Sequence, residues 1–472
     1  MNFGFDNGPH IKDKAHTSKI MFHLFISLIP IILFAIYKNG ILPYMGGYTN
    51  LYGALKPLLM IILGLSTSLL VELLYLKFAL KIKEKLWQRL KESYAMFPGL
   101  FLVLALPINT PLWLIILGSL VATLIGKLLF GGFGFNIFNP ALVGAIFVAS
   151  SYGSVIGTYL NSMELDTLAG ATPLTNLGSI DYVGTWSSIV EPFGHLRDFI
   201  FGFIPGSLGE TSKILIFISF VYLAITKVIK WIIPVSYIAI VFIMTSIIGY
   251  MNNMDIWYAF FNIFSGGLMF GAVFMATDPV TSPTTRIGQV LFGLGLGILT
   301  VIFRYLTPYP EGVLTSILTM NMLVYIIDRI GAKAKFKSQY RYIPICVLLI
   351  IIASLSLYIG NSLKKTTEED DKYKIVDVRE SDNQTIYDVT QKGFHGLIKA
   401  TITIANDKIV LVSVTSQSET YWTQMSNDNY LNKLITDQAN LDNVDAYSGA
   451  TITSNALKDM IKKTLKAYED RQ

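Results

Sequence analysis

The stretch IMFHLFISLIPIILFAIY at positions 20–37 decides the fold class, because it is almost entirely apolar and contains no acidic residue, lysine or arginine. A membrane core about 30 Å thick needs about 20 such residues in a helix. Ten further apolar ranges follow, at about 57–76, 95–107, 111–129, 138–150, 212–228, 231–250, 260–276, 287–305, 312–330 and 343–359. The sequence therefore predicts a polytopic all-α membrane protein, in which a ten-helix bundle is followed by an eleventh, anchoring helix.

The composition supports this class and excludes others. Of the 472 residues, 52% are hydrophobic and only 15% are charged, far from the usual soluble protein. The single Cys346 lies in an apolar run, so the chain by itself predicts no disulfide and no thiolate-bound iron–sulfur cluster. The five histidines lack metal-ligand spacing, and we predict no metal site, no catalytic triad, no dinucleotide fingerprint and no nucleic-acid binding.

The positions of the basic residues predict the orientation. The loop at 152–211 carries six acidic residues and a single Arg197, which predicts an extracytoplasmic loop, a cytoplasmic N-terminus and an extracytoplasmic end of the last apolar range. The expected location is the cell membrane, in contact with lipid. Lysines and arginines gather after every second apolar range, at Lys77, Lys81, Lys83, Lys85, Arg89, Lys91, Lys127, Lys227, Lys230, Arg286, Lys333, Lys335, Lys337 and Arg341.

A small α+β domain is expected after the last apolar range. The run KKTTEEDD at 364–371 is a charged linker. Alternating apolar patterns at 396–405 and 408–415 predict a hairpin, and helical patterns cover 429–438 and 454–468. We expect a membrane domain at 1–332, an anchor with its linker at 333–372 and an extracytoplasmic domain at 373–472.

Two heptads share the pattern Asp-x-x-small-Gly-Ala-Thr. One runs from Asp445 to Thr451, and the other runs from Asp166 to Thr172. Each places a hydroxyl behind two residues with almost no side chain, so a bulky group can approach the oxygen, while the aspartate can hold a metal or a phosphate donor. One copy alone is better explained as a polar loop that opens a helix. Two copies on the same predicted side of the membrane favour an attachment site.

The heptads resemble the flavinylation motif of the RnfG, NqrC, RnfD and NqrB subunits of ion-translocating redox complexes. The resemblance implies that a flavin transferase esterifies FMN through its phosphate to Thr451 and Thr172, giving up to two covalent flavins. Ala169 stands where the family usually has serine or threonine, which weakens the expectation for Thr172. The other motif residues implied to bind the cofactor are Asp445, Ser448, Gly449, Ala450, Asp166, Gly170 and Ala171.

The resemblance covers nearly the whole chain. Residues 9–328 resemble RnfD and NqrB. The last part of the chain resembles RnfG at positions 393–396, at Glu419-Thr420 and at the heptad that ends in Thr451. A fusion of two normally separate subunits is implied. Tyr421-Trp422 replaces the usual Pro-Gly, and one of the two rings could stack on a flavin, although core packing is the better expectation for at least one of them.

Several polar residues lie where a flavin or an ion could pass. The run GGFGFNIFNPALVG at 131–144 predicts a broken helix that lines a site, and a glycine cluster for helix packing is the equal alternative. Glu72 lies inside an apolar range, where either ion passage or a helix-to-helix hydrogen bond would explain it. The candidates for a flavin or ion path are Asn139, Glu72, Glu210, Asp278 and Glu419.

Three functions remain open at this point. The resemblance implies a membrane subunit of a redox-driven translocase of the ferredoxin:NAD or NADH:quinone type, which works with other membrane subunits and moves sodium ions or protons. A small-solute transporter also suits the broken helices. Extracytoplasmic flavin electron transfer without ion pumping is the third possibility. A further noncovalent flavin, such as riboflavin, remains open as well.

Overall fold

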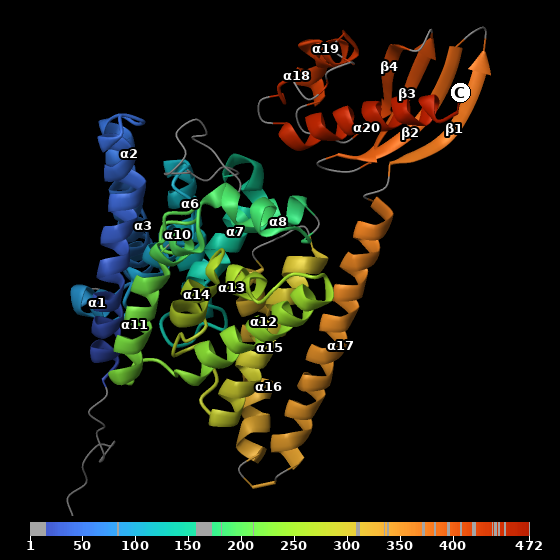
Figure 1. Ribbon diagram of the computed structural model, residues 1–472. Coiled ribbons are helices and arrows are strands. Elements are labelled where there is room, and N and C mark those ends of the chain that lie inside the picture. The colour runs from blue at the N-terminus through green and yellow to red at the C-terminus, as the bar shows by residue number, and fades with distance from the viewer. Residues whose placement is uncertain are drawn as a thin grey trace, which may run out of the picture. The chain divides into compact units, whose positions relative to one another are not determined.

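The computed structural model describes residues 16–471 with gaps at 83–84, 157–171, 181, 211, 308–311, 335, 338, 371–372, 382–383, 394–396, 406–407, 418–421, 437, 439–440, 442–443 and 448–449. The chain forms two compact units, one of Met1–Asn176 with Gly184–Ile359 and the other of Gly360–Gln472 with Leu177–Val183. Many of the helices and all four strands are labelled in Figure 1.

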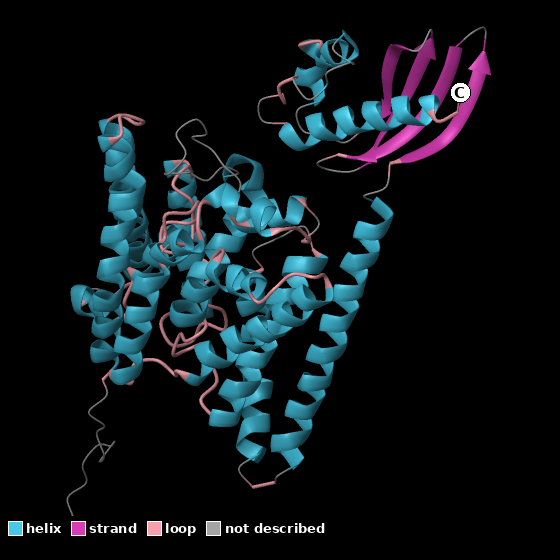
Figure 2. Ribbon diagram, in the orientation of Figure 1, coloured by secondary structure: helices cyan, strands magenta, loops and turns pink. Residues whose placement is uncertain are grey.

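The first unit is entirely helical in its described residues (Figure 2). Its first half contains α1 (Thr17–Ile36), η1 (Tyr37–Ile41), α2 (Leu42–Met45), α3 (Leu51–Leu74), η2 (Tyr75–Ala79), α4 (Leu86–Glu92), α5 (Phe97–Leu104), α6 (Leu112–Leu124), η3 (Leu128–Phe130) and α7 (Pro140–Ile156). After α8 (Pro173–Ser179), its second half contains α9 (Trp186–Ile189), η4 (Glu191–Phe193), α10 (Leu196–Phe201), α11 (Lys213–Ile225), α12 (Ile232–Met251), α13 (Trp257–Phe264), α14 (Leu268–Phe270), η5 (Gly271–Met275), α15 (Arg286–Leu306) and α16 (Val313–Ala334).

Each of the eleven expected apolar ranges contains a helix, so the predicted helical membrane bundle is confirmed. Seven helices in the described residues are long and apolar enough to cross a membrane alone. Another expected span is a pair of short helices, Trp257–Phe264 and Leu268–Met275, bent by 65° at the break between them. The helix breaks because Ser265 is extended and Gly266 has a positive φ of 62°, which interrupts the hydrogen-bond ladder.

Glycines let neighbouring helices touch along their backbones. A Cβ atom on Gly99 of α5 would lie 2.0 Å from the carbonyl oxygen of Gly64 on α3, and one on Gly144 of α7 would lie 2.6 Å from that of Gly118 on α6. In α15, a Cβ on Gly297 would lie 2.7 Å from Ile240 of α12, so this glycine also allows close helix packing.

Three π-helical turns, η1, η2 and η5, interrupt or extend membrane helices. A π-turn adds one residue to the α-helical count and so rotates the residues that follow it relative to those before it. In η1 this turn contains the buried Lys38. The backbone irregularity therefore coincides with a buried charge.

The helix α17 (Gln339–Asp370) leads into the second unit, a four-stranded antiparallel sheet in the order β1-β2-β3-β4 with helices on one face. The strands are β1 (Lys374–Ser381), β2 (Gln384–Lys392), β3 (Leu397–Ala405) and β4 (Lys408–Ser416), and the helices are α18 (Trp422–Asn427), α19 (Tyr430–Thr436) and α20 (Thr451–Glu469). The expected hairpin is β3–β4, and the expected α+β class is confirmed. The strands β1 and β2 were not predicted.

The core of the second unit forms where α20 covers the sheet. Side chains of the strands, such as Tyr387 and Ile402, pack with Leu457 and Met460 of α20, and all four are nearly fully buried. Trp422 packs against the edge of the same core. Core packing is therefore its observed role, as expected for one of the two aromatic residues.

Candidate flavin and ion sites

The first heptad ends at the start of α20. Ala450 occupies the N-cap position, and Thr451 is the first residue of the helix. Alanine offers no side-chain oxygen to the first amides of the helix. A helix N-terminus without a capping side chain favours a phosphate group.

The loop before Thr451 is fixed by its neighbours. The Tyr430 hydroxyl donates to the carbonyl oxygen of Asp445 at 3.0 Å, and the rings of Tyr430 and Tyr447 lie 5.8 Å apart, edge to face. The Tyr447 hydroxyl donates to the Asp428 carboxylate, and this hydrogen bond raises the pKa of Tyr447. The Asp445 side chain itself is exposed. The backbone is thus held in place while the motif carboxylate faces solvent.

The second heptad ends at a buried hydroxyl. Thr172 is 2% exposed, and its Oγ1 accepts a hydrogen bond from the Thr175 amide at 3.2 Å. The hydroxyls of Thr172 and Thr175 lie 2.7 Å apart. Pro173 follows at the first position of α8, where its missing amide costs nothing. Thr172 is therefore the side-chain cap of α8 before any modification.

Part of the predicted site cannot be placed. The described residues do not include Asp166, Gly170, Ala171, Ser448, Gly449 and Glu419, and they include Thr451 without its side chain.

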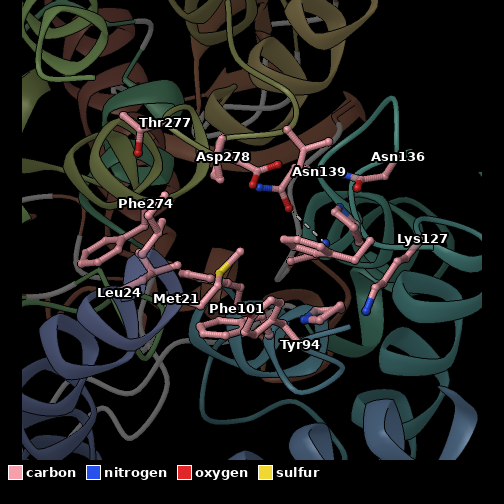
Figure 3. A pocket seen from close by; sticks show the side chains of 18 of the residues that line it. Met21, Leu24, Tyr94, Phe101, Lys127, Asn136, Asn139, Phe274, Thr277 and Asp278 are labelled. Carbon is pink, nitrogen blue, oxygen red and sulfur yellow. Dashed lines mark hydrogen bonds between the residues drawn. The ribbon is translucent and has the colours of Figure 1, made fainter. Parts of the chain in front are cut away.

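A pocket in the membrane unit brings several predicted residues together (Figure 3). It holds about 720 Å³ of space between atoms, including a part that is open to solvent. Aromatic and aliphatic side chains form most of the wall, and the polar groups are Asn136, Asn139, Lys127, Thr277 and Asp278. Such a mixture, mostly apolar with a few polar groups, is typical of sites for small molecules and cofactors.

The glycine-rich run forms one side of this pocket. Gly131, Gly132 and Gly134 all have positive φ angles between 92° and 112°, which only glycine adopts easily. Their loop brings Asn136 and Asn139 to the pocket in front of α7. The run therefore borders a pocket, while Gly144 at its end packs closely against Gly118 of α6.

Asn139 connects this loop to the rest of the bundle. Its Oδ1 accepts from the Ala141 amide at 3.1 Å, which caps α7, and its Nδ2 donates to the Met275 carbonyl at 3.3 Å. Met275 is the last residue of η5. Asn139 thus provides hydrogen bonds to the start of α7 and to the end of η5, where lipid could provide none.

Asp278 lines the same pocket, beside Asn139 (Figure 3). Burial raises the pKa of its carboxyl group, although the Thr281 hydroxyl donates to it at 2.9 Å. Nearby, Lys230 donates to the Ser282 hydroxyl at 3.0 Å, and burial lowers the pKa of Lys230. The loop that carries Asp278 is therefore hydrogen-bonded to the connection between α11 and α12.

Glu72 reaches the pocket through a partner. Its Oε2 lies 2.7 Å from Nζ of Lys127, and both side chains are at most 3% exposed. One turn away, the Thr123 hydroxyl donates to the Ser68 hydroxyl at 2.9 Å. Lys127 also donates to the Ser93 carbonyl at 2.6 Å and lines the pocket. Glu72 is thus one half of a buried ion pair between α3 and the end of α6.

Glu210 belongs to a different place. Glu210 precedes α11 in the chain and is 5% exposed. Its Oε1 accepts a hydrogen bond from the Ser207 amide at 2.8 Å. The structure therefore divides the described candidates for a flavin or ion path. Asn139 and Asp278 share the pocket, Glu72 touches it only through Lys127, and Glu210 lies in a separate buried cluster.

Sequence reasoning missed Lys127 as a functional candidate. It was used only to orient the membrane helices, because it lies near the end of an apolar range. A signal was present: Ser68 and Glu72 are four residues apart in one apolar range, as are Thr123 and Lys127 in another. Polar residues at equal helical spacing in two apolar ranges indicate facing partners.

Comparisons with known proteins agree with this architecture. A component of the proton-translocating ferredoxin:NAD(+) oxidoreductase complex of Clostridium ljungdahlii is 34% identical over 343 residues, 71% of this chain and 97% of that protein. A component of the Na(+)-translocating ferredoxin:NAD(+) oxidoreductase complex of Acetobacterium woodii is 31% identical, over 70% of this chain and 93% of that protein. A component of the Na(+)-translocating NADH-quinone reductase of Chromohalobacter salexigens is 30% identical, over 70% and 86% of the two chains.

The two units match two different families. Residues 393–466 match the FMN-binding domain, and residues 5–337 match the NQR2, RnfD, RnfE family. The expected combination of an RnfD- or NqrB-like membrane part with an FMN-binding part is confirmed. The chain belongs to the NQR2, RnfD, RnfE family and carries an FMN-binding domain on the C-terminal side of its membrane bundle.

Proposed function

We propose that this protein is a membrane subunit of a redox-driven ion-translocating complex, in which it carries electrons through covalently bound FMN. The observation that supports this most is the presence of an NQR2, RnfD, RnfE membrane unit and an FMN-binding domain in one chain. The relatives belong to complexes of the ferredoxin:NAD(+) and NADH-quinone types. Other membrane subunits and a flavin transferase would be its partners.

The residues at Thr451 suit a phosphate-linked flavin. The first amides of α20 have no capping side chain from Ala450, and the neighbouring residues of the heptad are small. The FMN phosphate would be bound to the threonine oxygen and would also face the positive end of the helix. FMN supplies one- and two-electron transfer, and the protein holds and tunes it.

The second threonine is compatible with the same group. The Thr172 oxygen accepts from the Thr175 amide, and the hydroxyl of Thr175 can act as the donor of their shared contact. Esterification removes the hydroxyl proton of Thr172, which neither contact requires. We therefore propose Thr172 as the second attachment residue, although its hydroxyl is buried.

The pocket between Asn139 and Asp278 suits a noncovalent flavin. Phe97, Phe101 and Phe133 provide apolar walls, and the cavity of about 70 Å³ would have to widen to admit a ring system. Asn136, Asn139 and Lys127 offer donors for the polar edge of a ring system. Glu72, through its ion pair, would keep Lys127 positioned.

The orientation is part of the proposal. The basic residues predict that the pocket loops face the cytoplasm, and that Thr172 and the second unit lie on the other side. Electrons would then pass between flavins at opposite faces of the membrane, while the helical bundle conducts sodium ions or protons.

In-gel ultraviolet fluorescence of the denatured protein tests the attachment. A covalent flavin survives denaturation, so the wild-type protein from cells that contain the transferase should fluoresce. Thr451→Ala and Thr172→Ala should each remove about half of the signal, and the double variant should be dark. Peptide mass mapping would give the modified residue directly. A dark wild-type band would contradict the proposal and favour a solute transporter.

A measurement of ion movement distinguishes the proposed function from the remaining alternative, electron transfer without ion pumping. The complex in sealed vesicles should build up an ion gradient when electrons flow. Flavin fluorescence without any gradient would instead indicate electron transfer that is not coupled to pumping.

A further inference from the structure

The break between α13 and α14 leaves backbone carbonyl groups without helical partners inside the bundle, and cationic side chains bind them. Nζ of Lys213 donates to the Gly266 carbonyl at 3.1 Å, and the guanidinium group of Arg304 donates to the Asn262 carbonyl at 2.6 Å. Lipid offers no donor to such groups. Side-chain cations therefore occupy positions where the end of a half-helix attracts positive charge.

The same ammonium group reaches a second segment. Nζ of Lys213 lies 2.5 Å from the carbonyl oxygen of Glu210, and the ammonium of Lys38, in η1, donates to the carbonyl oxygen of Ile204. The relative exposures are 0% for Lys38, 3% for Lys213 and 5% for Glu210. Two buried ammonium groups are thus held mainly by backbone oxygens.

Among the described residues, this cluster contains two ammonium groups and one carboxylate. Lys38 is repelled by Lys213 and attracted by Glu210, so the three groups interact electrostatically. The Glu210 Oε1 atom already accepts from the Ser207 amide. Burial in an apolar environment and a neighbouring cation both disfavour the charged form of an amine.

Two hydroxyls lie in the same segments. Ser207 and Ser265 are 1% and 0% exposed, and within the described residues their Oγ atoms have no hydrogen-bond partner. Ser207 donates its amide to Glu210, and Ser265 precedes Gly266, whose carbonyl binds Lys213. Carbonyl and hydroxyl oxygens beside a helix break are the ligands that membrane transporters offer to sodium.

We propose that Lys213, with Lys38 and Glu210, forms a cation-exchange site in which a sodium ion takes over the oxygens of Gly266 and Glu210 when the Lys213 amine releases its proton. This inference rests on the proposed ion translocation. The exchange balances: one proton leaves as one sodium ion enters, and the charge of the cluster stays constant. The lysine acts as a tethered cation that fills the site when sodium is absent.

Among the described residues, the other charged groups on elements packed against α11 and η1 lie apart from this cluster or are already part of it; Lys19 of α1 is exposed, and Glu72 of α3 is paired with Lys127. Of the elements packed against α11, α1 carries His23, whose ring bonds Tyr222 nine residues further along α11. On α10, Arg197 and Asp198 form an exposed pair. The helix α3, which packs on η1, carries the half-buried Lys56. Arg304 binds the neighbouring carbonyl and remains protonated at all relevant pH values.

The test is sodium transport by the purified complex in vesicles, measured at several pH values with electron flow switched on. In the wild type, protons and sodium compete, so the KM for sodium should rise on acidification, up to about tenfold for each pH unit. Lys213→Met should make this KM independent of pH. Lys213→Arg should lower transport at every pH, because guanidinium does not release its proton.

A purely structural role predicts the reverse pattern. Arginine would then replace lysine as a donor to Gly266 and rescue the function, while Lys213→Met would only lower the yield and the melting temperature. Lys38→Met removes a repelling charge, so Lys213 should hold its proton longer and the pH dependence of the KM should shift to higher pH. Lys56→Met, at a membrane lysine outside the cluster, is the matched control and should behave like the wild type.

Each negative result has a separate meaning. A pH-dependent KM that persists in Lys213→Met, or full transport by Lys213→Arg, overturns the exchange site. Wild-type ion transport that does not require sodium also overturns it but leaves electron-driven translocation standing. Electron flow without any ion movement overturns the proposed function itself.

Discussion

Glu72 and Lys127 form a buried ion pair, with Oε2 and Nζ 2.7 Å apart, that joins α3 to the end of α6 beside the pocket. Neither side chain is more than 3% exposed. Taking two charges out of water is costly, and their attraction offsets this cost only when both are present. Each of the two charges is therefore stabilised in the protein interior only while its partner is present.

We expect single substitutions in this pair to destabilise the protein more than the double substitution. Glu72→Gln or Lys127→Met leaves one charge buried without its partner, which costs about 3–5 kcal/mol. The double variant should recover about 1–3 kcal/mol of the summed loss. Thermal unfolding of the purified protein in detergent measures these differences. Ser66→Ala, at an exposed position of α3, is the control.

The same Glu72→Gln variant tests ion passage. Unchanged coupled transport in vesicles would exclude Glu72 from the ion path and leave it as a structural partner of Lys127. Additive effects of the two single substitutions on stability would contradict the ion pair as an energetic unit.

Asp445→Ala should slow flavin attachment without changing stability. The Asp445 side chain is exposed and its carbonyl oxygen accepts from Tyr430, so its carboxylate can assist the transferase reaction. Losing one charged contact of about 1.5–3 kcal/mol would lower the rate about 10-fold to 100-fold. The time course of in-gel fluorescence gives the rate. Asp459→Ala, at an exposed acid on α20, should attach flavin at the normal rate.

Asp328→Ala should loosen the start of α15. The Asp328 carboxylate accepts hydrogen bonds from the amides and hydroxyls of both Thr284 and Thr285, at 2.9–3.0 Å. Bonds to a charged acceptor stabilise by about 1.5–3 kcal/mol, and the group is partly exposed, so we expect a loss of about 1–3 kcal/mol in unfolding free energy. Arg329→Ala, at the exposed neighbour, should lose less than about 0.5 kcal/mol.

Asp278 should make stability depend on pH. Burial raises the pKa of its carboxyl group above that in the unfolded chain, so the folded protein binds the proton more tightly. Its contribution to stability is present below the unfolded pKa of about 4 and is lost as the pH rises through the raised value. Asp278→Asn should therefore match the wild type near pH 4 and have the higher melting temperature near pH 7. Parallel curves for both proteins would contradict this.

The sequence predicted most of the elements that depend on composition. Apolar ranges become helices because lipid or a dry core accepts little else, and the alternation around positions 396–415 becomes the β3–β4 hairpin. The strand β1 was missed because its side chains are largely exposed, so it shows no clear alternation, and its partner β2 is stabilised mainly by distant packing under α20.

The site was predictable only where single residues carry a signal. Asn139 and Asp278 stood out as polar residues at membrane depth, and the structure places both at one pocket. Their meeting could not be predicted, because it depends on how α7 and η5 pack across the bundle. Lys38 and Lys213 were also missed, because lysines near the ends of apolar ranges are usually explained by the membrane surface.

The π-helical turn at Tyr37–Ile41 sets the direction of the segment that follows it. Because each residue of an α-helix turns the chain by about 100°, removal of the single extra residue would rotate α2 relative to α1 and Lys38 even if every amino acid type were retained. A one-residue deletion near Gly40 should therefore do more harm there than replacement of any one of its neighbours. In this part of the chain, the number of residues matters as much as their chemistry.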